Sequence, residues 1–231
     1  IVSIQDNELL VSTPNEKEIH EAMLSINPES APGPDGFSGS FYRAAWDLVK
    51  GDMVAAVQDF FKGWCLPRVA YATTLVLISK IPYPSSIHHY RPVSMCNVPY
   101  KVLATIINRR LAAHLPTLIS DEQYGSVKGR SIQGVIALAQ DVVVDLKLMA
   151  HGSNISVKLD MEKAYDLMVR SFIIKVLARF GFSSWFIDLI FRCIISPWLG
   201  VRFRGKHHGF FKTVRVLRQG DPLSPSIFIM S

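Results

Sequence analysis

The sequence has few cysteines and no long apolar run, and each shortage excludes a class of protein. Its three cysteines, Cys65, Cys96 and Cys193, stand far apart and match neither a disulfide framework nor a zinc-ligand pattern, so we expect buried thiols. No apolar run approaches the roughly 18 to 20 residues that a membrane span needs, and the first residues do not resemble a signal peptide. These absences predict an intracellular protein.

Acidic residues are also fewer than basic ones. The 231 residues include 25 Lys and Arg against 19 Asp and Glu, which gives a net charge of +6. A basic balance favours an anionic partner such as nucleic acid, although many basic proteins bind none. Hydrophobic residues make up 49% of the chain, so it can bury one large core or two modest ones and is not a disordered segment.

Apolar periodicity predicts a mixture of helices and short strands. The expected helices cover residues 13–28, with Thr13 and Glu16 as a capping box, and 41–49, 54–64, 100–115, 131–149, 171–180 and 184–195. Short β-branched or apolar runs predict strands at 73–79, 155–160, 199–203 and 210–214. Two prolines and two glycines make a rigid turn or linker at 31–36, and a proline-rich loop is expected at 82–92.

Asp160 is the strongest candidate for a functional residue. It ends an apolar strand containing Ile155, Val157 and Leu159, and an ionised carboxylate delivered by a buried strand needs a metal or a partner. Magnesium prefers such hard oxygen ligands, and phosphoryl transfer relies on metal ions that stabilise the attacking and leaving oxygens. The alternatives are a solvated or capping aspartate and, far less favoured, the site of an unrelated metal-dependent phosphatase.

Six short motifs follow one another along nearly the whole chain. They are Ala31–Phe37, Leu77–Lys80, Tyr90–Lys101, Glu122–Ile132, Lys158–Asp166 and Arg218–Pro225. In this order they resemble the reverse transcriptases of LINE-type, non-LTR retrotransposons, with plant elements the nearest. Each motif alone is weak evidence, whereas six in one order are highly specific.

The resemblance implies the fingers and partial palm of a right-hand polymerase, without a thumb. Such a fragment is an α+β fold in which helices cover one face of a small antiparallel sheet. Residues 1–30 would form a lead-in helix, 31–150 the fingers region and 151–231 the partial palm.

The resemblance also implies RNA-directed DNA polymerase activity. In the complete enzyme the primer 3'-hydroxyl attacks the α-phosphate of a deoxynucleoside triphosphate, on an RNA template and with two magnesium ions, and pyrophosphate leaves. The expected partners are therefore the RNA template, the DNA primer and the nucleotides. Flanking domains of a longer polyprotein and action in the nucleus are expected on the same ground.

Three residues of the fifth motif receive roles from the resemblance. Asp160 would bind both magnesium ions, and the carbonyl of Met161 would add a backbone ligand. Tyr165 would press on the sugar of the incoming nucleotide and exclude a 2'-hydroxyl, unless the ring only packs in the core. Asp166 is expected to form structural hydrogen bonds.

The nucleotide would also meet residues from two other motifs. Lys80 and Arg91 flank one loop, so a hairpin could aim both cations at the triphosphate; the alternative is a solvated surface pair. Arg218 and Gln219 would lie beside the nucleotide and template, and Gly220 would allow close backbone approach.

A template strand would meet the basic loop that contains Lys128 and Arg130. The loop contains Gly125 and Gly129, and cations in such a loop suit phosphate contacts that are independent of sequence; the alternative is a solvated basic loop. Asp221 precedes Pro222, and this pair suits an N-cap followed by a proline at the first helical position.

The chain departs from the family in its acidic residues. The second metal site of the family uses two adjacent aspartates, and this chain contains no such pair. None of the acids after Asp160 is expected to replace it, so the fragment alone should be inactive. The pairs His88–His89 and His207–His208 have no further ligand at suitable spacing and are expected in surface loops.

Smaller departures concern single positions within or beside the motifs. They are Ser126, Leu167, Met168, Val214 and Val216. A β-branched residue at 216 resists the positive φ that glycine adopts freely. The alternative function is therefore a decayed, catalytically inactive remnant that at most binds nucleic acid.

Overall fold

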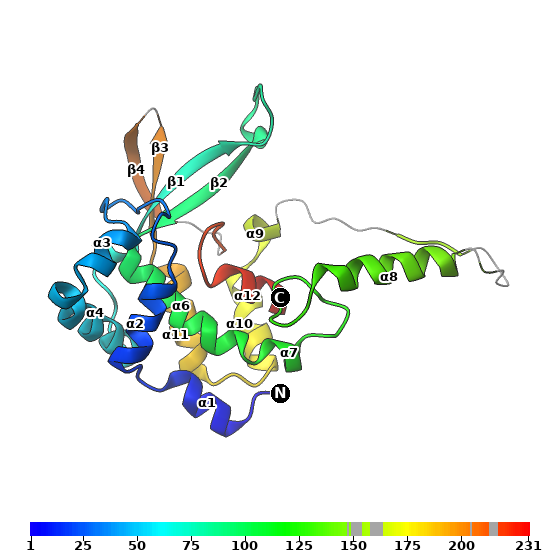
Figure 1. Ribbon diagram of the computed structural model, residues 1–231, viewed down its shortest axis with the longest axis horizontal. Helices are drawn as coiled ribbons and strands as arrows, with labels where there is room; N and C mark the ends of the chain where they lie inside the picture. Colours follow the sequence, from blue (N-terminus) through cyan, green and yellow to red (C-terminus); the bar gives the residue numbers. More distant parts are fainter. Residues whose placement is uncertain (147, 149–153, 158–163, 204, 213–216) are drawn as a thin grey trace.

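A helical body carries a four-stranded sheet that rises from one side of it (Figure 1). This computed structural model describes residues 1–231 except 147, 149–153, 158–163, 204 and 213–216. The helices are α1 (Ile4–Val11), α2 (Glu16–Ser25), α3 (Gly39–Ala44), α4 (Trp46–Phe61), α5 (Arg68–Tyr71), α6 (Val98–Ala112), α7 (Leu115–Leu118), α8 (Ile132–Asp145), α9 (Ala164–Leu167), α10 (Arg170–Arg179), α11 (Ser184–Ile195) and α12 (Ser224–Met230), with one 3-10 turn, η1 (Ile87–His89). None of the described helices combines the length and the apolar composition that crossing a bilayer would require.

The sheet has the strand order β2-β1-β3-β4. Its strands are β1 (Ala72–Ser79), β2 (Tyr90–Cys96), β3 (Trp198–Phe203) and β4 (Lys206–Lys212). Two antiparallel hairpins, β1–β2 and β3–β4, join through a parallel pairing of β1 with β3. The prediction of an antiparallel sheet is therefore wrong for the central pair. Parallel neighbours need a long crossover, and the helices between β2 and β3 provide it.

Strand β2 begins at Tyr90 and so includes the last three residues of the predicted proline-rich loop. Arg91 pairs with Ile78, and Pro92 pairs with Leu77. Proline cannot donate a ladder hydrogen bond, and it is tolerated here because β2 is an edge strand. The proline content of the segment was therefore a misleading signal against a strand.

Helix α6 lies at the centre of the core. Its predicted apolar face is fully buried, including Leu103, Ile106 and Leu111. Side chains from Val2 to Met230 form one contiguous cluster around it. The predicted division at residue 150 therefore does not separate two cores, because β1 and α6 pack with elements from the second segment.

The turn at 31–36 packs against the body instead of forming a free linker. The side-chain oxygen of Asn97 accepts a hydrogen bond from the Asp35 amide at 3.2 Å, and the Asn97 amide donates to the Val69 carbonyl at 2.7 Å. A Cβ on Gly33 would lie 2.0 Å from Asn97 Oδ1, so only glycine fits at this position.

The N-terminal region differs from its prediction in two details. Helix α2 is capped by the side chain of Asn15, which accepts from the Glu18 amide at 2.9 Å, and Thr13 does not cap it. The sequence also failed to predict α1. This helix is fixed by Asn7, whose side chain bonds to the Gly181 carbonyl at 2.8 Å and the Ser183 amide at 2.6 Å.

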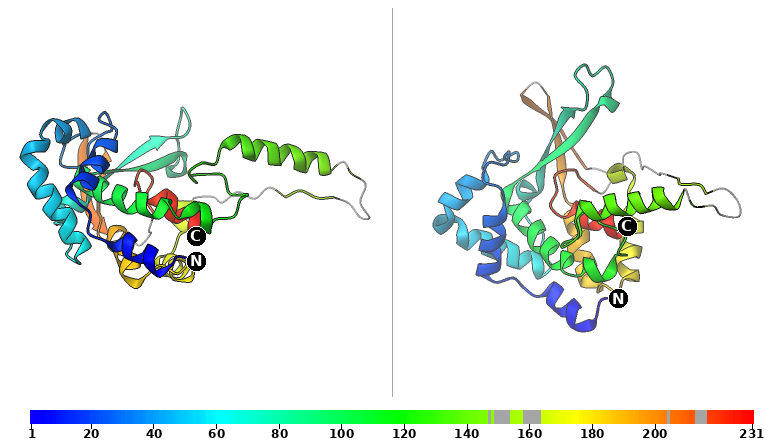
Figure 2. Two further views of the ribbon diagram at one scale, coloured as in Figure 1. Left: turned by 60° about the horizontal axis from the view of Figure 1, so that its bottom comes forward. Right: turned by 45° about the vertical axis from the view of Figure 1, so that its right-hand side comes forward.

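Helix α8 projects away from the body, as Figure 1 and the left view of Figure 2 show. The predicted helix is present, but its apolar residues are exposed, including Ile136 at 53% and Val144 at 58%. The strand predicted at 155–160 is not present in its described part, where Ile155 and Val157 are 81% and 71% exposed. A strand needs a neighbour for its backbone hydrogen bonds, and among the described residues none pairs with this segment.

We predict that Gly33→Ala destabilises the protein by about 1–3 kcal/mol, because the added methyl group would overlap Asn97 and force the turn off the body. Urea unfolding measures the change in the free energy of unfolding. Gly51→Ala is the matched control, since Gly51 lies within α4 and a Cβ there meets open space. The control should be neutral or stabilise the protein by up to about 1 kcal/mol. Equal unfolding midpoints for both variants would contradict this account of the turn.

Candidate functional site

Lys80 and Arg91 come together at the tip of the β1–β2 hairpin. The Lys80 amide donates to the His89 carbonyl at 2.7 Å, which continues the ladder by one residue. Because Arg91 lies opposite Ile78, and Lys80 follows Ile78 by two residues, both cations lie on the same face of the hairpin. Both side chains are exposed, and no carboxylate of the described chain pairs with either.

The turn that contains Gln219 docks on the same hairpin. The Ser94 amide donates to the Gln219 carbonyl at 2.8 Å, and Gly220 follows with φ +96°. A Cβ on Gly220 would lie 2.7 Å from the Ser94 carbonyl oxygen. The glycine therefore permits close approach to β2. Its predicted contact with a template stays a prediction.

This docking brings two distant motifs together. Ser94 lies three residues along β2 from Arg91, a distance of roughly 10 Å in an extended strand. Gln219 is half-buried at that position, whereas Arg91 is exposed.

Arg218 faces the interior, unlike the nucleotide-facing position predicted for it. Its guanidinium is buried, donates to Thr73 Oγ1 at 3.1 Å, and also bonds to the hydroxyl of Tyr100 and the carboxylate of Asp221. The Tyr100 hydroxyl donates to Asp221 Oδ2 at 2.6 Å. A direct contact between Arg218 and a nucleotide would require these buried bonds to break.

Asp221 has a structural role, although it is not an N-cap. Its Oδ1 accepts from the Leu223 amide at 2.9 Å, and α12 begins only at Ser224. Burial raises the pKa of the neighbouring Tyr100 hydroxyl well above its ordinary value, so this hydroxyl remains protonated and can donate to the carboxylate at neutral pH. No pattern in the sequence indicated that Tyr100, on the apolar face of α6, would have a polar partner.

The two cations of the predicted template loop behave differently. The Arg130 guanidinium donates to backbone carbonyls of the preceding loop, at 3.0 Å from Ile119 and 2.7 Å from Gln123, and pairs with Asp121 at 3.1 Å. Arg130 therefore ties its own loop together. Lys128 is exposed and remains available for a phosphate.

The fifth motif is described only in part. Asp160 and Met161 lie outside the described residues. Tyr165 is half-buried and stacks on Phe228 of α12, with ring centroids 5.0 Å apart. This contact favours the core-packing alternative for Tyr165 and leaves its predicted sugar contact untested.

No group of three or more His, Cys, Asp or Glu side chains in the described ranges could hold a metal ion. Burial raises the pKa of the Cys96 and Cys193 thiols, whereas Cys65 is exposed and not buried as predicted. His207 and His208 lie in strand β4, where the sequence predicted a loop.

Comparisons with known proteins agree with the motif order. The family described as reverse transcriptase (RNA-dependent DNA polymerase) matches residues 81–231. The transposon TX1 uncharacterized 149 kDa protein of Xenopus laevis is 26% identical over 234 residues, covering 100% of this chain and 18% of the relative. The Pol polyprotein of the type-2 element R2DM of Drosophila melanogaster is 24% identical over 223 residues, covering 96% of this chain and 20% of the relative. The chain thus spans about a fifth of the length of these curated relatives.

We predict that Tyr100→Phe destabilises the protein by about 1–3 kcal/mol, because Asp221 loses a buried donor that water cannot replace. Tyr83→Phe is the matched control, since Tyr83 is 91% exposed and its hydroxyl is solvated. Chemical unfolding of both variants measures the difference. If the two variants unfold at the same midpoint as the unchanged chain, the buried network does not stabilise the fold.

Proposed function

Because this chain belongs to the reverse transcriptase family, we propose that its hairpin tip and the turn docked beside it bind the deoxynucleoside triphosphate of an RNA-directed DNA polymerase. The chain is a fragment of the reverse transcriptase domain of a non-LTR retrotransposon. The substrates and partners of the whole protein, including an RNA template, a DNA primer and flanking domains, are part of the proposal.

One observation carries the proposal, namely the docking of the Gln219–Gly220 turn on β2. The Gln219 carbonyl accepts from Ser94 of β2, the strand that also holds Arg91, while Lys80 lies across the same hairpin. Arginine offers a planar fork to phosphate oxygens and lysine a point charge, so the pair suits a triphosphate. The Lys80 ammonium donates to the His88 carbonyl at 3.2 Å, and neither cation pairs with a carboxylate of the described chain, so both keep their charge for a phosphate.

The proposed role of each remaining site residue follows from its exposure and its neighbours. Lys128 would bind template phosphates, and Tyr165 would contact the sugar from its position beside Phe228. Arg218 and Arg130 would hold the nucleotide turn and the template loop in place without touching the ligands. These assignments rest on exposure and hydrogen bonding in the described chain.

Metal dependence is general in this family. Asp160 and the carbonyl of Met161 are proposed as ligands of two magnesium ions on the resemblance alone. Asp188 and Asp221 are not available as further magnesium ligands, because Asp188 pairs with Arg192 at 2.7 Å and Asp221 is bonded to Arg218. Action in the nucleus is likewise proposed from the resemblance.

We predict that Arg91→Lys raises the KM for the nucleotide at least about 10-fold in primer extension, because one charge-assisted hydrogen bond of about 1.5–3 kcal/mol is lost. The assay uses an RNA template, a DNA primer and the protein continued through its downstream reading frame. Arg179→Lys is the matched control, since Arg179 is exposed on α10, away from the sheet (Figure 1).

Asp160→Asn in the same protein should abolish extension. If the longer protein never extends a primer, the chain is a decayed remnant and the proposed activity is wrong. If it extends a primer and Arg91→Lys behaves like Arg179→Lys, the nucleotide does not bind at the hairpin tip.

We predict that Lys128→Gln changes the binding of template RNA, whereas Arg130→Gln changes the stability of the fold. Lys128→Gln should reduce the salt dependence of template RNA affinity by roughly 0.7 of a counterion, the value for one phosphate contact on a single strand, and leave thermal unfolding unchanged. Arg130→Gln should lower the unfolding temperature, because several carbonyls of the loop lose their donor. Unchanged RNA binding by Lys128→Gln would exclude its contact with the template.

A further inference from the structure

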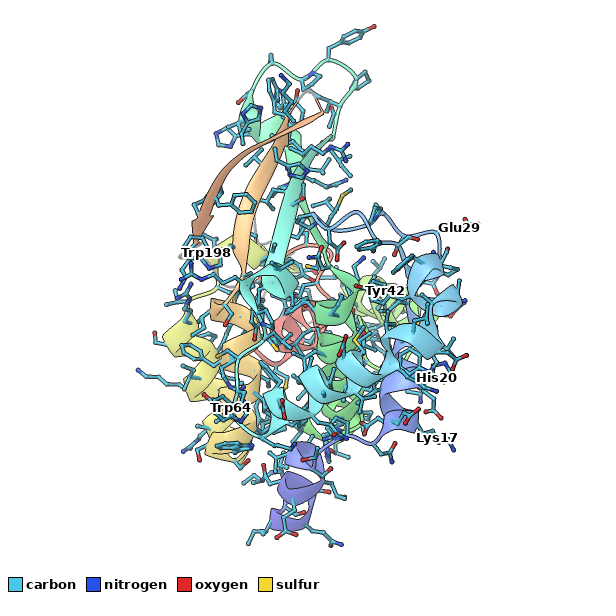
Figure 3. The ribbon with its side chains drawn as sticks, turned by 90° about the vertical axis from the view of Figure 1, so that its left-hand side faces the viewer. Lys17, His20, Glu29, Tyr42, Trp64 and Trp198 are labelled. Carbon is cyan, nitrogen blue, oxygen red and sulfur yellow. The ribbon has the colours of Figure 1, made fainter. Side chains whose placement is uncertain are left out.

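A cavity of about 410 Å³ opens at the foot of the sheet, far from the hairpin tip. Its lining includes Asp35, Arg68, Asn97, Trp198 and Phe210. Figure 3 shows Trp198 where the strands meet the helical body. Strand β1 begins at Ala72 in this cavity, and Lys80 follows eight residues later, so roughly 26 Å of extended chain separates the cavity from Lys80.

Two aromatic residues, Trp198 of β3 and Phe210 of β4, line the cavity. Trp198 and Gly200 lie on the same face of β3, two residues apart. A Cβ on Gly200 would lie 3.0 Å from the Gly209 carbonyl oxygen, so the glycine lets the backbone of β4 approach β3 closely just before Phe210. The Phe210 side chain is 60% exposed and is therefore accessible to a ligand.

Two cations flank the tryptophan. The Arg68 guanidinium and the Lys212 ammonium each lie 5.3 Å from the centroid of the Trp198 ring. Both residues are exposed, and in the described part of the chain no carboxylate pairs with them. The sequence has no acidic residue between Asp188 and Asp221, so the whole β3–β4 hairpin is free of negative side chains.

The lining also includes two polar side chains, Asp35 and Asn97. Asp35 is half-buried, and its Oδ1 accepts from the Phe37 amide at 3.0 Å. Asn97 is already satisfied by the backbone of the neighbouring segments. The cavity thus combines two aromatic residues with Arg68 in its lining and Lys212 beside Trp198.

This combination matches the surfaces on which single-stranded nucleic acids bind. Unpaired bases stack on aromatic rings whatever their sequence, while cations follow the backbone phosphates. A duplex has no unstacked base to insert. An acidic peptide would pair with the cations but would make no use of the two rings.

We propose that this cavity binds one unpaired base of a single-stranded nucleic acid against Trp198 and Phe210, with the adjoining phosphates on Arg68 and Lys212. The site is separate from the nucleotide and template residues assigned above. It requires no catalysis, so it can exist whether or not the chain belongs to an active polymerase.

The test measures the affinity of this chain for fluorescein-labelled single strands of about 10 nucleotides by fluorescence anisotropy. One strand carries bases, and a second strand of the same length carries abasic sites, which keep the phosphates. Phe210→Leu and Trp198→Leu should each weaken binding of the first strand by about 5-fold or more and leave binding of the abasic strand unchanged. Arg68→Gln and Lys212→Gln should weaken both.

Trp64→Leu is the matched control, because Trp64 is 70% exposed on the helical body (Figure 3) and undergoes the same chemical change. Circular dichroism establishes that each variant is folded, and the exposed Phe210 keeps the test valid if Trp198→Leu unfolds. Equal binding of the two strands by the unchanged chain would overturn the proposal. So would equal displacement of the labelled strand by polyglutamate, or losses in Trp64→Leu as large as those in Phe210→Leu.

The outcome is independent of primer extension. A protein that extends primers while Phe210→Leu binds single strands normally lacks this site but retains its proposed activity. A protein that never extends primers but shows the ring-dependent preference for bases retains the site.

Discussion

The buried ion pair between Arg218 and Asp221 is the interaction on which the arrangement of the other elements depends. Through it and its neighbours, β1 contributes Thr73, α6 contributes Tyr100, and α12 contributes Ser224, whose hydroxyl accepts from the Arg218 amide at 3.1 Å. Removing one partner of such a pair typically costs about 3–5 kcal/mol, because the other charge is left buried and alone. The main effect of the pair is therefore to fix the position of the turn at 218–221. Its net contribution to the free energy of unfolding is smaller.

The position of that turn decides the geometry of the proposed nucleotide site. With Arg218 held in the interior, the next two residues reach the edge of β2, where Gly220 leaves room for the Ser94 carbonyl. The parallel pairing of β1 with β3 then joins this hairpin to the aromatic face at the foot of the sheet. One sheet thus carries two proposed sites at opposite ends, and at each of them a glycine lets two backbone segments approach closely.

Periodicity predicted the elements whose sides differ clearly in polarity, such as α6, α10, α11 and β1. It failed where the deciding contact is distant in sequence. The edge position that tolerates Pro92 depends on β1, and the docking of α1 depends on the α10–α11 turn. The motifs identified the family, but they could not tell which basic side chains face inward. Arg218 and Arg130 look like ligand-binding residues in the sequence and instead satisfy buried or backbone acceptors.

That difference explains where the excess positive charge of the chain resides. Three arginines with largely buried side chains form ion pairs and therefore contribute no net charge to the surface. They are Arg110 with Glu18, Arg192 with Asp188 and Arg218 with Asp221. The net charge of +6 must therefore come from cations without such partners. In the described chain these include Lys80 and Arg91 at the hairpin tip, Lys128 in the loop, and Arg68 and Lys212 at the foot of the sheet. Because these acids pair with the buried arginines, the exposed cations can bind a polyanion. They lie at the positions that the two proposals assign to phosphates.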